Sequence, residues 1–121
     1  MATFNGYVSN VVVYGVQEGK GYPFETPTVT MQAGMVAGSL LKITANKYVW
    51  AATADAANVV GVLADSETQF DGEVSAGDHK LVVAVRACGL GKNYLKYSDG
   101  AVDAAGIAKL LTLGMKVEDQ Y

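Results

Sequence analysis

The sequence predicts a mainly β domain of the α+β class: a small antiparallel β-barrel or sandwich-like fold with one short helix and an extended N-terminal arm. Short runs rich in β-branched and aromatic residues recur along the chain, separated by turns that contain glycine. One segment near the C-terminus instead has the apolar spacing of a helix. The 121 residues fit a single domain, and because 50% of them are hydrophobic we expect a core that needs no metal or disulfide.

The first 27 residues differ from the rest of the chain. Residues 7–16 are rich in valine and tyrosine and predict an extended strand. Residues 17–27 contain both prolines of the chain and two glycines, a composition typical of a linker. We therefore predict two parts: an N-terminal arm and linker over 1–27, and a β-rich domain over 28–121.

Two neighbouring runs of the domain predict a β-hairpin. Residues 39–44 and 47–51 both have the composition of strands. Ala45 and Asn46 between them predict a tight turn, which would join the two strands directly.

The remaining strands follow with less regular spacing. A strand is predicted over 59–64, where Gly61 indicates a bulge or the close approach of another backbone. Residues 65–78 predict a long polar loop. The run 81–88 is apolar on both faces, which predicts a strand in the middle of the sheet. Residues 115–118 predict a last short strand.

One helix is predicted shortly before the C-terminus. Asp103 can cap its N-terminus, and Ile107, Leu110 and Leu111 recur at the spacing of one helical face. Gly114 stands where many helices end in a residue with left-handed backbone geometry. The segment therefore predicts a short amphipathic helix with both ends marked.

The charge of the chain argues against nucleic acid as a partner. The formal net charge is −3, and the nine Lys and Arg residues are scattered rather than gathered in a stripe that could neutralise phosphates. Aromatic side chains that stack on bases come with a positive groove, which this sequence lacks. We therefore assign four aromatic residues to core or subunit-interface packing: Tyr48, Trp50, Tyr94 and Tyr97.

The sequence also argues against a membrane partner. No apolar stretch approaches the ~20 residues needed to cross a bilayer. The N-terminus lacks the basic and apolar regions of a signal peptide. We expect a soluble protein made in a cytoplasm.

The residues do not form a catalytic, cofactor-binding or metal-binding pattern. The single histidine, His79, stands apart from any serine elbow, and the single cysteine, Cys88, ends an apolar run that favours core packing. Residues 89–92 fail the phosphate-loop pattern and predict a turn, while the acidic residues of 65–78 lack the order of a calcium loop. We expect no catalytic residue, no cofactor and no metal.

Several segments of the domain follow one another in a recognisable order. They are 38–44 leading to 48–50, then 56–64, 81–87 and 107–117. In order, spacing and hydrophobic class these segments resemble the lambda-type head decoration (capsid cement) proteins of tailed phages. The segment over 59–64, Val-Val-Gly-Val-Leu-Ala, is the one most similar to a strand of that family. The resemblance covers residues 28–121.

The resemblance implies a structural virion protein that is not an enzyme and is synthesised in the host cytoplasm. Members of that family assemble as homotrimers at local threefold sites on the outer surface of the expanded head. There they bind the major capsid protein and stabilise the capsid, and their N-terminal arm pairs with strands of that protein. The arm is longer and more strand-like here than in the family. The capsid-binding arm implied by the resemblance includes Tyr7, Val8, Val11, Val12, Val13, Tyr14 and Val16.

Two alternatives remain open at the level of the sequence. A tail-tube or head–tail joining protein would also be small, β-rich and short of charge, but it would assemble in rings of six rather than in threes. A small-ligand-binding β-barrel or an accessory enzyme subunit belongs to another class. That class predicts a roomy apolar cavity with a few convergent polar groups.

We expect residues 28–121 to fold without residues 1–24, because two glycines and Pro23 separate the arm from the sheet-forming segments. Thermal melting of the truncated chain measures this. A cooperative transition is the expected result, and its loss would mean that the arm contributes a core strand.

Overall fold

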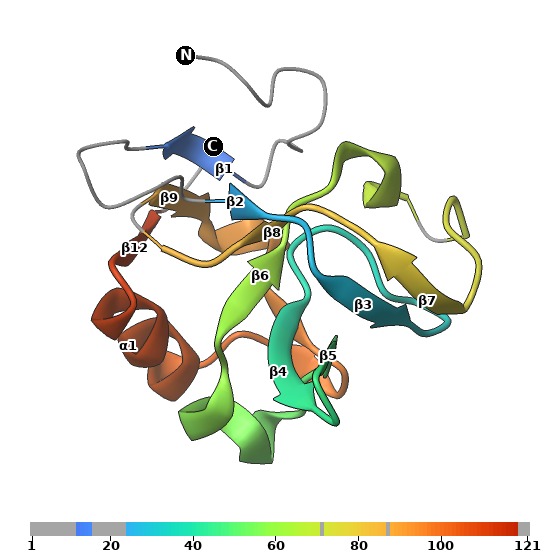
Figure 1. Ribbon diagram of the computed structural model, residues 1–121. Coiled ribbons are helices and arrows are strands. Elements are labelled where there is room, and N and C mark those ends of the chain that lie inside the picture. The colour runs from blue at the N-terminus through green and yellow to red at the C-terminus, as the bar shows by residue number, and fades with distance from the viewer. Residues whose placement is uncertain (1–11, 16–23, 71, 87, 119–121) are drawn as a thin grey trace.

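The computed structural model describes residues 12–15, 24–70, 72–86 and 88–118 (Figure 1). Its largest element is a seven-stranded sheet of order β2-β8-β6-β4-β5-β3-β7. In chain order these strands are β2 (Phe24–Glu25), β3 (Thr28–Met31), β4 (Leu40–Thr44), β5 (Lys47–Trp50), β6 (Gly61–Leu63), β7 (Gly77–Lys80) and β8 (Val83–Ala84).

Two smaller sheets and one α-helix complete the described part of the fold. A three-stranded sheet has the order β1-β9-β12, and β10 pairs with β11 in a short hairpin. The helix α1 packs against β12 and the first of three 3₁₀ turns (Figure 1). The bounds are β1 (Val12–Gly15), β9 (Cys88–Gly91), β10 (Lys96–Tyr97), β11 (Gly100–Ala101), α1 (Ala104–Thr112) and β12 (Met115–Glu118), with 3₁₀ turns over Thr53–Asn58, Ser66–Thr68 and Lys92–Tyr94.

The prediction of a mainly β domain with one short helix is confirmed. The large sheet is not closed into a barrel, because its edge strands β2 and β7 each pair with a single neighbour in the described residues. Pairing is also mixed rather than purely antiparallel, since β3 runs parallel to β5 and β12 runs parallel to β9. Side chains alternate in the same way in parallel and antiparallel strands, so strand direction was not readable from the sequence.

The middle strands of the large sheet are buried on both faces. Leu40 and Leu41 of β4 belong to two different core clusters, and so do Val62 and Leu63 of β6. The first cluster includes side chains of α1, β9 and β12, and the second includes side chains of β3. Fully burying one such side chain contributes roughly 1.5–3 kcal/mol. Two cores on opposite faces therefore hold the middle of the sheet.

Two predictions about the backbone are confirmed. Ala45 and Asn46 have positive φ angles of 53° and 66°, the geometry of a type I′ turn, and they join β4 to β5. Gly61 lies against β8: a Cβ atom there would be 2.8 Å from Cγ1 of Val83 and 3.0 Å from the carbonyl oxygen of Ala84. The lack of a side chain at Gly61 lets β6 and β8 pair this closely.

The apolar run 81–88 is divided between two sheets and does not form one long strand. β8 covers only Val83–Ala84 and lies between β2 and β6, so the predicted position inside the sheet is confirmed. The chain resumes as β9 at Cys88, in the three-stranded sheet. A continuous apolar run indicates burial on both faces, but it does not indicate where the chain passes from one sheet to the next.

Part of the segment assigned to the arm and linker is paired with the body. β2 pairs antiparallel with β8, and Phe24 packs against the first core cluster. An ion pair between Arg86 and Glu25 joins the same two regions. β1 pairs with β9. Cooperative folding of residues 28–121 alone stays a prediction, and the loss of these two strands should lower the melting temperature of the truncated chain.

Helix α1 begins and ends at the predicted residues, but the face that it buries differs from the predicted face. Asp103 accepts a hydrogen bond from the N–H of Gly106 at 2.9 Å, and Gly114 has a φ of 87° just beyond the helix. The buried residues are Gly106 and Leu110, whereas Leu111 is 63% exposed. Leu111 is one residue beyond Leu110, which places it about 100° further around the helix. The expectation that Leu111 shares the buried face is therefore wrong.

Gly106 marks the point at which α1 approaches Tyr97. The Tyr97 hydroxyl donates to the Asp103 carboxylate at 2.8 Å, and burial together with this hydrogen bond raises the pKa of Tyr97 to about 12. The N–H of Gly106 and the Tyr97 hydroxyl both donate to Asp103 and lower the pKa of its carboxyl. A Cβ atom at residue 106 would lie 2.3 Å from the Tyr97 hydroxyl oxygen and 3.0 Å from Cγ2 of Val102. A side chain at this position would have to displace the hydroxyl.

We expect Gly106→Ala to lower the free energy of unfolding by about 1–3 kcal/mol, as overpacking does. The sign of this change is informative. Helix propensity alone would raise the free energy of unfolding, because alanine is favoured over glycine in a helix by about 1 kcal/mol. Urea denaturation measures the change. The substitution should cost less in a Tyr97→Phe background, which lacks the hydroxyl. An equal cost in both backgrounds would contradict the steric explanation.

Candidate functional site

Strand β9 lies in the middle of the three-stranded sheet, with a strand on each edge (Figure 1). β1 pairs with it antiparallel, with Val12 opposite Leu90 and Tyr14 opposite Gly89, and the register shifts between Val12 and Tyr14. β12 pairs with the other edge in parallel. All four residues of β9 are buried. The first and the last of the described strands, β1 and β12, are therefore joined through β9.

The predicted capsid-binding arm is described only in part. Val12, Val13 and Tyr14 lie in β1, where the backbone pairs with β9 of the same chain. The composition of this segment correctly indicated a strand, but composition does not identify the partner of a strand. The other arm residues lie outside the described ranges: Tyr7, Val8, Val11 and Val16. Binding of the arm to a capsid stays a prediction.

Cys88 and the glycines that follow it have structural roles. The Cys88 side chain belongs to the first core cluster, and burial raises the pKa of its thiol to about 12. The thiolate is the nucleophilic form, so burial and the raised pKa both disfavour reaction of this thiol near neutral pH. The turn predicted over 89–92 is wrong, because Gly89 and Gly91 continue β9 and the 3₁₀ turn begins only at Lys92. Tertiary pairing on both edges makes a strand of this glycine-rich segment.

His79 contacts Ser75 but is not placed to act as its base. The Nε2 atom of His79 is 2.9 Å from the carbonyl oxygen of Ser75 and 3.4 Å from its hydroxyl. A carbonyl oxygen only accepts hydrogen bonds, so Nε2 carries a proton in the shorter contact. A protonated Nε2 cannot remove the proton of the hydroxyl. The pair stabilises the entry into β7.

The acidic residues of 65–78 stabilise the loop and its surroundings. The buried Asp65 carboxylate accepts hydrogen bonds from two backbone N–H groups, at 2.9 and 3.0 Å. Asp78 accepts from Lys47 and from the hydroxyl of Thr30, and these two contacts lower the pKa of its carboxyl. No group of three His, Cys, Asp or Glu side chains that could hold a metal occurs in the described ranges.

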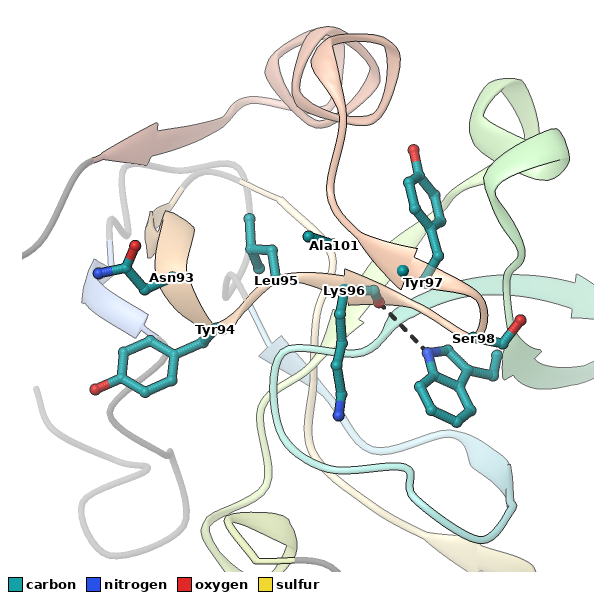
Figure 2. Close-up of a pocket in the computed structure, with 9 residues that line it drawn as sticks. Asn93, Tyr94, Leu95, Lys96, Tyr97, Ser98 and Ala101 are labelled. Atoms are coloured by element: carbon teal, nitrogen blue, oxygen red, sulfur yellow. Dashed lines mark hydrogen bonds between the residues drawn. The ribbon is translucent and has the colours of Figure 1, made fainter.

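A hollow of about 420 Å³ opens beside β10 and β11 (Figure 2). Trp50 lines it: the indole Nε1–H donates to the carbonyl oxygen of Lys96 at 3.4 Å, and the Lys96 ammonium lies 5.6 Å from the ring centroid. Side chains alternate along this segment, with Tyr94 and Lys96 on one side and Leu95 and Tyr97 on the other (Figure 2). Leu95 and Tyr97 are buried in the first core cluster. The hollow is lined by residues 93–98 with Trp50, Gly100 and Ala101.

The hollow was missed at the level of the sequence, although its aromatic residues were singled out. Tyr97 is a core residue, Tyr48 and Trp50 pack against the second core cluster, and Tyr94 is partly exposed at the hollow. A volume of about 420 Å³ is at the small end of the ~300–1,000 Å³ range of ligand pockets. The hollow is also open to solvent. It differs from the roomy cavity that a ligand-binding barrel predicts.

The described residues form a β-rich body that pairs with an N-terminal strand, and its buried polar side chains are hydrogen-bonded. The family model of the bacteriophage PhiTE minor capsid decoration protein matches residues 1–121. The chain belongs to this family, which consists of phage capsid proteins and is not a class of enzymes. The resemblance to phage head decoration proteins is thereby confirmed. No curated protein and no solved structure matches the chain. Among the described helices none is long and apolar enough to span a membrane.

We expect Tyr14→Pro to lower the melting temperature. Proline removes the backbone N–H and fixes φ, which a paired strand tolerates poorly. A loss of 1 kcal/mol corresponds to roughly 4 °C for a chain of this size. Tyr14→Thr, which keeps the N–H and suits a strand, is the control. Equal melting of the two variants would mean that β1 contributes no stability through its backbone.

Proposed function

We propose that this protein binds the outer surface of the expanded phage head as homotrimers at local threefold sites, where it contacts the major capsid protein and stabilises the capsid. The observation that carries the proposal is the match of the whole chain, residues 1–121, to a capsid decoration family. The trimer, the threefold site and the expanded state are taken from the resemblance to lambda-type head decoration proteins. The protein would be synthesised in the host cytoplasm before it reaches the virion.

The N-terminal segment is the part that we assign to the capsid. Residues 1–27 are the capsid-binding arm and linker of this proposal, and residues 28–121 are the decoration domain. Support comes from β1, since residues 12–15 already add a strand to a sheet. Because those residues are engaged with β9, we assign the segment before them, which contains Tyr7, Val8 and Val11, to a strand of the capsid protein. Strand addition gains affinity from main-chain hydrogen bonds.

The surface of the body suits extensive contact with other protein. Charged residues make up 17% of the chain, below the usual share of about 25%. Four large apolar side chains are exposed in the described residues: Ile43, Phe70, Tyr94 and Leu111. Exposed apolar groups favour burial against a partner because water is released from them. The surface therefore supports a role in a crowded protein lattice.

Three arms on one trimer would act together. Once one arm has bound, the others search a small volume, with an effective concentration in the millimolar range for short linkers. The overall affinity then exceeds that of a single arm by about 10²–10⁴-fold. A short strand can hold a trimer on a capsid by this effect, even though one arm alone would dissociate readily.

Capsid occupancy tests the proposal. The purified protein is added over a concentration series to expanded and unexpanded capsids that lack it, and the bound copies are counted by cryo-electron microscopy. We expect three copies per threefold site on expanded capsids and no ordered copies on unexpanded capsids. Rings of six, or binding at the tail rather than the head, would overturn the proposal in favour of the tail-tube or joining alternative.

Deleting residues 1–11 should reduce capsid occupancy at limiting concentration by about tenfold or more, because three arms lose their contacts together. The melting temperature should stay unchanged, since β1 and the body are retained. Tyr14→Pro is the opposite control, because it weakens the body's own sheet but leaves residues 1–11 in place. Full occupancy after the deletion would mean that attachment comes from the body surface and not from this segment.

A further inference from the structure

Phe70 is displayed on a turn that is held by its own hydrogen bonds. Its side chain is 71% exposed, more than any other large apolar side chain of the described residues. The N–H of Phe70 donates to the Glu73 carboxylate at 3.0 Å, and the N–H of Glu73 donates back to the Phe70 carbonyl oxygen at 3.3 Å. The buried Thr68 anchors the base of the turn, since its hydroxyl donates to the Asp65 carbonyl oxygen at 2.7 Å. These hydrogen bonds hold the backbone at Phe70, so less backbone entropy is lost when its side chain binds a partner.

The hollow beside Trp50 has the size and the chemistry to receive such a side chain. Its volume of about 420 Å³ is large enough for one aromatic ring together with the residues next to that ring on the inserted turn. Trp50 and Tyr94 supply aromatic surface, and aromatic pairs in stacked or edge-to-face contact are stabilised beyond the burial of their area. Phe70 does not line the hollow of its own chain.

The charges around the two features are opposite. The exposed Glu67 and Glu73 lie on either side of Phe70 in the sequence, and no Lys or Arg occurs in segment 65–78. The hollow is lined by Lys96 and by no acidic residue, and the exposed Lys92 directly precedes the residues that line it. Complementary charges of this kind orient partners and accelerate their encounter.

The two features are held in a fixed relation by one segment of the chain. The N–H of Ala37 donates to the carbonyl oxygen of Thr68 at 2.7 Å, and the N–H of Lys96 donates to the carbonyl oxygen of Gly38 at 3.0 Å. Gly38 is tightly packed there, because a Cβ atom would lie 1.9 Å from the carbonyl oxygen of Tyr94. The segment 37–38 therefore connects the base of the Phe70 turn directly to the strand that lines the hollow.

We propose that Phe70 of one copy inserts into the hollow beside Trp50 of a second copy, with the acidic turn against Lys92 and Lys96 of that copy. The projection and the hollow are different surfaces, so the contact is heterologous and forms a closed ring when the rotation between copies closes. The inference rests on the homotrimer proposed above and identifies its subunit interface.

The proposed contact can be removed by changing either the projecting Phe70 or the hollow that receives it. Phe70→Ser deletes the projection, and Ser98→Trp fills the hollow, with Ala101→Trp as a second way to fill it. Sedimentation equilibrium over a concentration series should give a dissociation constant raised by about tenfold or more for each variant, as for other buried aromatic anchors. Leu111→Ser and Ala108→Trp are matched controls on α1, and both should assemble like wild type. Melting curves identify any variant that fails to fold.

Mixing the variants gives a sharper test. A Phe70→Ser subunit keeps an intact hollow, and a Ser98→Trp subunit keeps an intact projection, so one of each can form a single contact. Native mass spectrometry should detect a one-to-one heterodimer in the mixture and monomers in each variant alone. A mixture that stays monomeric while wild type assembles would overturn the inference.

The possible outcomes separate this interface from the proposed function. A wild-type dimer that Phe70→Ser dissociates would keep the interface and overturn the trimer. A trimer that assembles equally well with Phe70→Ser, or that Leu111→Ser weakens as much, would overturn the interface and leave the capsid role intact. Unchanged assembly combined with lost capsid occupancy would assign Phe70 to the capsid protein instead. A wild-type protein that stays monomeric would also overturn the interface.

Discussion

Strands β4, β6 and β8 direct neighbouring side chains to opposite faces of the sheet, and both faces are buried. This burial requires cover on each side. On one face the contacts come from α1, β9 and β12, and on the other they come from Met35 and from Trp50 and β3, which belong to more distant strands of the same sheet. Most of the elements of the fold are positioned by this requirement, since a sheet with two apolar faces is not stable in water until both are covered.

The strand β9 connects that core to the N-terminus. Its Cys88 and Leu90 side chains belong to the first core cluster, while its two edges hold β1 and β12. The N-terminal strand is therefore joined to the body through a buried strand. Residues 12–15 are thereby engaged in pairing within their own chain.

Polar groups complete the fold without a metal or a disulfide among the described residues. Asp65 holds two backbone N–H groups, Asp103 caps α1 and binds the Tyr97 hydroxyl, and the buried Ser39 donates to the Val36 carbonyl oxygen at 2.7 Å. No buried side-chain nitrogen or oxygen in the described ranges lacks a hydrogen-bond partner. Burying polar groups is tolerated only when they are paired in this way. The buried polar groups of the described residues therefore stabilise the fold rather than weaken it.

The sequence by itself determined the class of the fold, the hairpin turn at Ala45 and Asn46, both ends of α1 and the strand character of residues 12–15. These features depend on local backbone preference, which each residue carries with it. Tertiary structure decided the partner of β1, the strand at Gly89 and the exposed position of Leu111. It also created the hollow beside Trp50, which brings together segments from β5 and β10. Each of these depends on which distant segments meet, because pairing and packing between them outweigh local preference.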